Sequence, residues 1–150
     1  MDVLFINPGN ASGIYQDLSK VYSAIETPTW SLLLAQSCRS VGYDVGILDV
    51  NAERLPTQEA VDRVRSLNPR LVCFAVYGQN PNAGTVNMAG TVMLARALKE
   101  AGLECPISVV GSHVQALPHE TLEREKDIID IILTNEGVYS LWNLLKLEDL

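Results

Sequence analysis

An unbroken apolar run at residues 71–76, LVCFAV, most constrains the fold of this chain. A strand that is apolar at every position has both faces covered, which is typical of a parallel strand between two layers of helices. The run therefore predicts a central strand. The polar segment at residues 77–84, YGQNPNAG, follows its carboxyl end. Ligands of open α/β sheets bind outside these ends, so we expect the functional site there.

The remaining elements alternate between strand and helix patterns. Short apolar stretches predict four more strands, at residues 2–7, 44–49, 106–111 and 127–133. Helical spacing and end signals predict helices at residues 28–41, 57–67, 85–101, 119–124 and 138–147. Residues 112–118 are expected to form an exit loop. The pattern indicates an α/β fold, a doubly wound five-stranded parallel sheet of flavodoxin-like or Rossmann-like order 2-1-3-4-5 with helices on both faces.

Length and charge narrow the class of protein. At 150 residues the chain fits one domain, residues 1–150, with enough length for a real core. The net charge of -7 argues against a nucleic-acid partner, which needs a clustered basic face. We expect no membrane partner either, because the sequence shows no secretory leader and no apolar run of about 18 residues.

The three cysteines lie too far apart for a metal knuckle or a redox motif. Cys38, Cys73 and Cys105 are separated by 35 and 32 residues, and two of them sit in apolar runs. Reduced, buried thiols are therefore expected, together with a cytoplasmic location.

The strand ends lack the motifs of several doubly wound families. No GxxxxGK[ST] phosphate loop, no GxGxxG after the first strand and no GxSxG nucleophile elbow occurs. The third strand ends without the phosphoacceptor Asp of a receiver domain. Catalytic side chains are sparse, so the crevice is expected to hold a ligand rather than to transform one.

Individual residues near the strand ends leave alternatives open. His113 faces the expected crevice, yet a lone loop histidine is more often a hydrogen-bonding surface residue, and His119 is expected to be solvated. Glu136 could accept a ligand hydroxyl or cap the last helix. Tyr77 could stack on a flat ligand, as could Tyr15 unless it packs within its own loop.

The ordered set of signals resembles the N-terminal cobalamin-binding domain of cobalamin-dependent radical S-adenosylmethionine enzymes. The family's Asn-Pro-Pro after strand one is similar to residues 7–9 (NPG), and its Pro-Pro-Leu-Gly-Leu helix start resembles residues 27–33 (TPTWSLL). Its Gly-His-Glu-Val turn and strand ending in Asp match residues 42–49 (GYDVGILD). Its Gly-Gly-Pro-His and Gly-Glu-Gly strings are similar to residues 111–113 (GSH) and 135–137 (NEG).

This resemblance implies a cobalamin site. The nucleotide tail would enter between the loops after strands three and four, and the corrin would lie over residues 7–15. The implied cofactor-binding residues are Asn7, Pro8, Gly9, Ser12, Tyr15, Tyr77, Gly78, Gln79, Asn80, Gly84, Gly111, Ser112, His113, Glu136 and Gly137. The loop after the first strand has no DxHxxG motif, so the resemblance implies cobalamin without a protein imidazole on cobalt.

The resemblance also implies a larger parent enzyme. The cluster-binding CxxxCxxC is absent, so no catalysis is expected from this chain alone. We expect the chain to be the N-terminal part of a methyltransferase. Its radical S-adenosylmethionine barrel, in the same chain or complex, would hold a 4Fe-4S cluster and S-adenosylmethionine. An alternative stays open: a degenerate relative without cofactor that serves as an interaction or substrate-docking domain, supported by Gly9 and Ser112, which depart from the family's usual strings.

Overall fold

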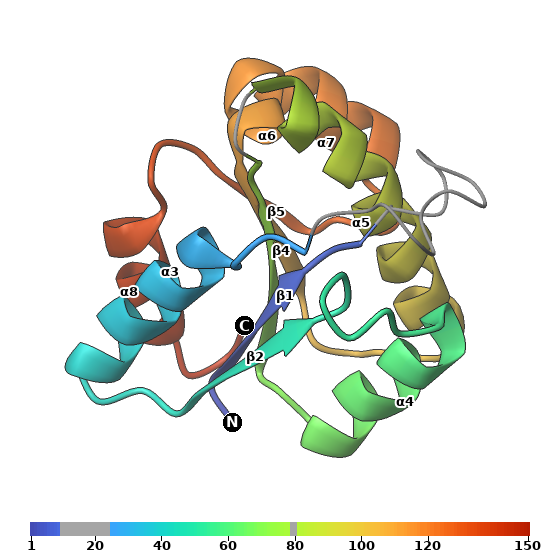
Figure 1. The fold of residues 1–150 in the computed structure, drawn as a ribbon. Coiled ribbons are helices and arrows are strands. Elements are labelled where there is room, and N and C mark those ends of the chain that lie inside the picture. The colour runs from blue at the N-terminus through green and yellow to red at the C-terminus, as the bar shows by residue number, and fades with distance from the viewer. Residues whose placement is uncertain (10–24, 79–80) are drawn as a thin grey trace.

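The structure, a computed structural model, describes residues 1–9, 25–78 and 81–150 of the chain. Five parallel strands form one sheet in the order β2-β1-β3-β4-β5 (Figure 1). The strands are β1 (Val3–Asn7), β2 (Val45–Asp49), β3 (Leu71–Val76), β4 (Ile107–Gly111) and β5 (Ile131–Leu133). The described helices are α3 (Thr29–Ser40), α4 (Thr57–Leu67), α5 (Pro81–Glu100), α6 (Ser112–Ala116), α7 (Pro118–Glu125) and α8 (Val138–Leu145). The predicted fold class and strand order are confirmed.

The strand register brings the carboxyl ends of the strands to one edge of the sheet. Asn7 pairs with Asp49 across β1 and β2, and Val76 pairs with Gly111 across β3 and β4. The segments that follow these ends therefore meet, although they are far apart in the sequence.

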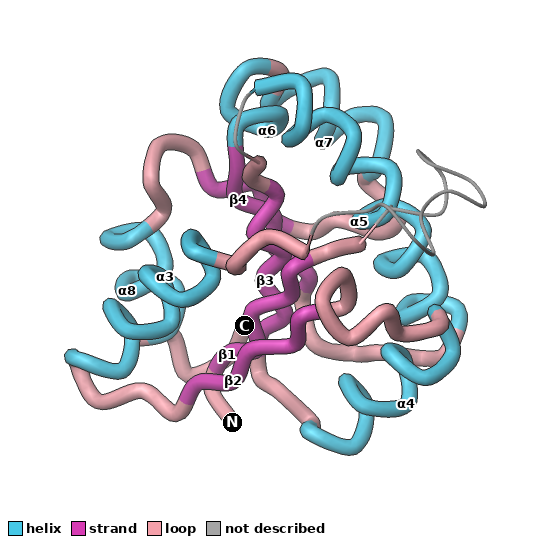
Figure 2. The backbone as a smooth tube through the Cα atoms, viewed as in Figure 1, coloured by secondary structure: helices cyan, strands magenta, loops and turns pink. Residues whose placement is uncertain are grey.

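Helices cover both faces of the sheet (Figure 2). In β3, Leu71, Cys73 and Ala75 pack in a cluster with residues of α3 and α8. Val72, Phe74 and Val76 point the other way, into a cluster with residues of α4 and α5. Every β3 side chain is buried, and each large one contributes about 1.5–3 kcal/mol. This two-sided burial explains the unbroken apolar run.

Several predicted element boundaries are corrected. Helix α5 begins at Pro81 instead of residue 85, because Pro suits the first turn of a helix, where its missing N–H is not needed. The expected exit loop at residues 112–118 contains the helix α6, so the described chain has one helix more than the five expected. The fifth strand is shorter than predicted. The backbone amides of Ile128 and Ile129 bond to Glu125 O, which ends α7 with a turn and delays the strand to Ile131.

The amino edge of the sheet is closed around Arg70. Its Nη1 donates to Asp2 Oδ1 at 3.1 Å, and its Nη2 donates to the carbonyl oxygen of Leu147 at 2.6 Å. Its backbone amide bonds to Met1 O at 3.0 Å. One side chain thus joins segments from both ends of the chain.

The cysteines are free thiols, as expected. Cys38 and Cys73 are buried and Cys105 is half-buried. Burial raises the pKa of Cys38 to about 11 and that of Cys73 to about 12. No helix in the described residues has the length and apolar character needed to cross a membrane.

Candidate functional site

A hydrogen-bonded turn fixes the carboxyl ends of β1 and β2. Asn7 Nδ2 donates to Asp49 Oδ1 at 2.8 Å, and the same oxygen accepts from the backbone amide of Ala52 at 2.9 Å. The backbone amide of Val50 bonds to Asn7 O at 3.1 Å. The Asp49 carboxylate therefore organises this turn and holds the Asn7 side chain in place.

Gly9 lies against the same turn. A Cβ at this position would sit 2.9 Å from the Cα of Asn51, closer than real side chains approach. Close contact between two backbone segments is enough to explain why a glycine stands at this position.

An aromatic pair stands at the middle of the carboxyl edge. Trp30, at the start of α3, stacks on Tyr77, at the end of β3, with ring centroids 4.4 Å apart and planes 19° apart. Asn87 Nδ2 donates to Tyr77 O at 3.0 Å, which holds the backbone below the ring. Burial, with smaller effects of Cys73 and Glu136, raises the pKa of Tyr77 above its ordinary value. Tyr77 thus stacks on another side chain of the protein, and its stacking on a flat ligand stays a prediction.

Two cavities flank this pair. The first, of about 660 Å³, lies over the ends of β1 and β3. Uncharged polar side chains predominate among its polar lining residues, which include Asn7, Thr27, Ser31, Asn51 and Asn87. The second, of about 700 Å³, lies between the pair and the segment that leads from β5 into α8. Because Trp30 and Tyr77 line both cavities, the pair is their common wall.

Ser31 is buried within the first cavity wall. Its side chain is 1% exposed, and its Oγ has no hydrogen-bond partner in the described part of the chain. It occupies the first turn of α3, where no side chain caps the helix and no acidic residue lies. A buried hydroxyl without a partner lowers the stability of a protein by about 1–3 kcal/mol. A ligand that bonds to this hydroxyl would remove that penalty.

The space between the ends of β3 and β4 is closed by close packing. A Cβ at Gly111 would overlap the carbonyl oxygen of Val76, and the φ of +151° at Gly111 is accessible essentially to glycine alone. A Cβ at Gly84 would overlap Ser112 Oγ, which is itself buried without a partner among the described residues. A Cβ at Gly78 would overlap Ala83. Gly84, Gly111 and Ser112 thus join α5 and α6 to the sheet, and they do not line the two cavities beside the aromatic pair.

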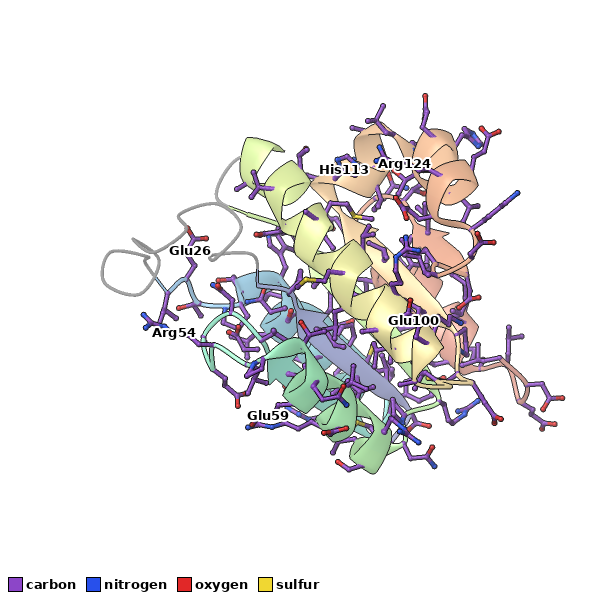
Figure 3. The ribbon with its side chains drawn as sticks, turned by 90° about the vertical axis from the view of Figure 1, so that its right-hand side faces the viewer. Glu26, Arg54, Glu59, Glu100, His113 and Arg124 are labelled. Atoms are coloured by element: carbon purple, nitrogen blue, oxygen red, sulfur yellow. The ribbon has the colours of Figure 1, made fainter. Side chains whose placement is uncertain are left out.

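His113 lies on a different side of α5. Its Nδ1 is 3.2 Å from Thr85 Oγ1, which agrees with its interpretation as a hydrogen-bonding residue. Both residues line a third cavity, of about 450 Å³, between α5 and α7, which also includes Arg124 (Figure 3). His119 is exposed at the start of α7.

Glu136 and Gly137 lie at the far wall of the second cavity. Helix α8 has no side-chain cap, so Glu136 does not cap it, and the carboxylate is exposed. Gly137 is buried against Val110. The structure thus gives Glu136 no capping role, and its contact with a ligand stays a prediction.

The predicted site is brought together in part. Asn7, Pro8, Tyr77 and Gly78 meet in the first cavity. Ser12, Tyr15, Gln79 and Asn80 lie outside the described residues. The cavity residues that the prediction missed include Trp30, Ser31, Asn51 and Asn87. The Thr27-Pro28 helix start pointed to α3 at this edge, and Asn51 follows the end of β2 just as Pro8 follows β1.

The side chains described at this edge are suited to binding a ligand. In the described ranges, no group of three or more His, Cys, Asp or Glu residues is arranged to hold a metal ion. The cavities offer amides, hydroxyls, the carboxylates of Glu26 and Glu136, and one aromatic stack. They therefore suit a large ligand rich in hydrogen-bonding groups and with flat or apolar parts.

Comparison with known proteins gives one family. A model of the B12 binding domain matches residues 17–143, most of the chain. A search of curated proteins found no match.

Proposed function

The chain belongs to the family of B12-binding domains, and from this premise we propose that it holds cobalamin at the carboxyl edge of the sheet, as the cofactor module of a radical S-adenosylmethionine methyltransferase. The observation that carries the placement is the pair of cavities that share the Trp30–Tyr77 wall. A cofactor made of a corrin ring and a nucleotide tail has two bulky parts, and two adjacent cavities offer a space for each.

The cavity chemistry fits this cofactor. The rim of a corrin carries carboxamide groups, which both donate and accept hydrogen bonds. Asn7, Asn51 and Asn87 offer amides of the same kind, and Ser31 offers a buried hydroxyl without a described partner. These residues would hold the corrin rim. Tyr77, Glu136 and Gly137, in the second cavity, would contact the tail, so we shift its entry from the β3–β4 loops to this cavity.

We further propose that no protein imidazole binds the cobalt. The sequence contains two histidines, His113 and His119, and the segment that follows β1 contains neither. His113 Nδ1 is engaged with Thr85 and lies in the wall of the third cavity. Cobalamin held in this way supplies a cobalt centre that can carry a methyl group.

The parent reaction is proposed from the ordered motifs at residues 7–9, 27–33, 111–113 and 135–137. An iron–sulfur cluster is held by Cys thiolates. Cys38, Cys73 and Cys105 lie 35 and 32 residues apart, which is not the close spacing of a cluster-binding motif. The cluster and S-adenosylmethionine would therefore be held by a partner barrel domain.

Cobalamin uptake tests the first part of this proposal. The chain is mixed with hydroxocobalamin, desalted, and measured by visible absorption. Corrinoid bands that elute with the protein at near one per chain are expected. A colourless protein with an unchanged circular dichroism spectrum would contradict the proposal and favour the docking alternative.

The absence of a histidine ligand has its own readout. After reduction to cob(II)alamin, the electron paramagnetic resonance spectrum is expected to lack nitrogen splitting from an axial imidazole. Histidine-type splitting that disappears in His113→Ala would contradict this proposal.

The proposed parent enzyme has a separate test. The natural protein is purified anaerobically, and its iron and sulfide are measured. Four iron and four sulfide ions per cobalt are expected, and a protein without iron or sulfide would overturn the proposed parent.

A further inference from the structure

The first turn of α3 holds backbone amides and one side-chain hydroxyl that have no partner among the described residues. Helix α3 has 12 residues, and Pro28 stands at its N-cap position without a side-chain cap. The backbone amide of Thr29 bonds to Thr27 O at 2.7 Å and that of Leu32 to Pro28 O at 3.0 Å. Among the described residues, no backbone acceptor is recorded for the amides of Trp30 and Ser31. The amino end of a helix attracts anions and carbonyl oxygens through such amides.

The Ser31 side chain supplies the independent observation. Its Oγ is buried and has no hydrogen-bond partner in the described ranges, and Ser31 lines the first cavity together with Pro28, Thr29 and Trp30. A serine in the first turn of a helix commonly bonds to its own backbone or to water. The Ser31 hydroxyl bonds to no group of the described residues, and Ser31 borders a cavity, so this hydroxyl can bond to the occupant of that cavity.

We infer that Ser31 Oγ and the amino end of α3 together bind an acceptor oxygen of the corrinoid, either a carboxamide carbonyl of the ring or the phosphodiester of the nucleotide tail. This inference rests on the proposed cobalamin function and adds a specific binding residue to it. Both sources present the same chemistry, an oxygen that accepts hydrogen bonds and gains from the positive end of the helix dipole.

If the Ser31 hydroxyl binds the ligand, its removal should stabilise the free protein and weaken the complex. In Ser31→Ala, the free protein loses a buried unpaired group and its melting temperature rises by about 2–4 °C. The complex loses a hydrogen bond, so the dissociation constant for hydroxocobalamin increases by about tenfold. A hydroxyl with only a structural role would lower the melting temperature when removed.

The matched control is Ser40→Ala, in the last turn of the same helix. Ser40 Oγ donates to Ser37 O at 2.7 Å and is exposed, away from the cavity. This variant makes the same chemical change in α3 and is expected to leave the dissociation constant unchanged.

Equilibrium dialysis of wild type, Ser31→Ala and Ser40→Ala against hydroxocobalamin and against aquacobinamide, which lacks the nucleotide and its phosphate, tests the inference. A Ser31→Ala loss with both corrinoids supports it and assigns the oxygen to a carboxamide. A loss confined to hydroxocobalamin supports it and assigns the phosphodiester. Equal binding by wild type and Ser31→Ala, or a lower melting temperature of free Ser31→Ala, overturns the inference alone. A wild-type chain that takes up neither corrinoid overturns the proposed function and the inference with it.

Discussion

Trp30 and Tyr77 stack at a centroid distance of 4.4 Å although they come from the start of α3 and the end of β3. The contact joins a helix terminus to the central strand, and two cavities open on either side of it. The pair is therefore part of the fold and part of the candidate site, so its two roles need separate measurements.

Removing the ring of Tyr77 should cost more stability than removing its hydroxyl. Aromatic pairs contribute about 0.5–1.5 kcal/mol beyond the area they bury, while the Tyr77 hydroxyl is a long 3.5 Å from Asn135 O. In urea unfolding, we expect Tyr77→Leu to lower the free energy of unfolding by about 1 kcal/mol and Tyr77→Phe to change it by less than about 0.5 kcal/mol. Equal losses in both variants would assign the stabilisation to the hydroxyl.

Gly111→Ala should be severely destabilising. The added Cβ would overlap the carbonyl oxygen of Val76, and the backbone would be strained at a φ of +151°. Strain and overpacking each cost about 1–3 kcal/mol. The control is Gly102→Ala, where φ is also positive but no atom lies within 4 Å of the new Cβ. Urea unfolding should show a clearly larger loss for Gly111→Ala, and similar losses would contradict close packing at the β3–β4 ends.

Stability should fall steeply in alkaline solution. Burial raises the pKa of Cys73 from 9.0 to about 12 and that of Cys38 to about 11. Above pH 9 the unfolded thiols lose their protons while the native ones keep them. The stabilisation is therefore complete below pH 9 and is lost as the pH rises towards 11 or 12. Each thiol contributes a slope of about 1.4 kcal/mol per pH unit.

Cys73→Ala isolates one of these slopes. Under reducing conditions, urea unfolding between pH 9 and pH 11 should show a shallower fall in the free energy of unfolding than in wild type, by the contribution of one thiol. A parallel curve, displaced but with the same slope, would show that Cys73 does not titrate differently in the two states.

Arg70→Met should loosen both chain ends. The variant keeps an apolar stem but loses the bonds to Asp2 Oδ1 and Leu147 O. Because Arg70 is partly exposed, we expect a loss of about 1 kcal/mol, with faster amide hydrogen exchange in residues 146–150. Arg63→Met, which removes the ion pairs of this α4 residue with Glu53 and Glu59, is the control and should leave that exchange unchanged.

The fold could be predicted from the sequence because each strand is a local apolar run closed by turn residues. The strand order follows from the alternation of strands and helices. Helix α6 could not be predicted, because SHVQA is too short to show a period and its formation depends on Val114 entering the core beside β4. The delayed start of β5 likewise depends on how α7 ends.

The candidate site was predictable only at its strand ends. Asn7 ends β1 and Tyr77 follows β3, and both line the cavities as expected. Trp30, Ser31 and Asn87 reach the same space from helices, and their direction depends on how α3 and α5 pack on the sheet. Gly84 and Gly111 were expected to admit a ligand, but a glycine in the sequence does not reveal whether its open side faces a ligand or another backbone.

The Arg70 junction also determines on which side of the domain an attachment through the chain ends would lie. Asp2 and Leu147 meet the same guanidinium at the amino edge of the sheet, whereas the cavities open at the carboxyl edge. If the domain is attached to a surface, a dye or a second protein through either end of the described chain, the attachment lies at the amino edge of the sheet. The cavities at the carboxyl edge would still face the solution.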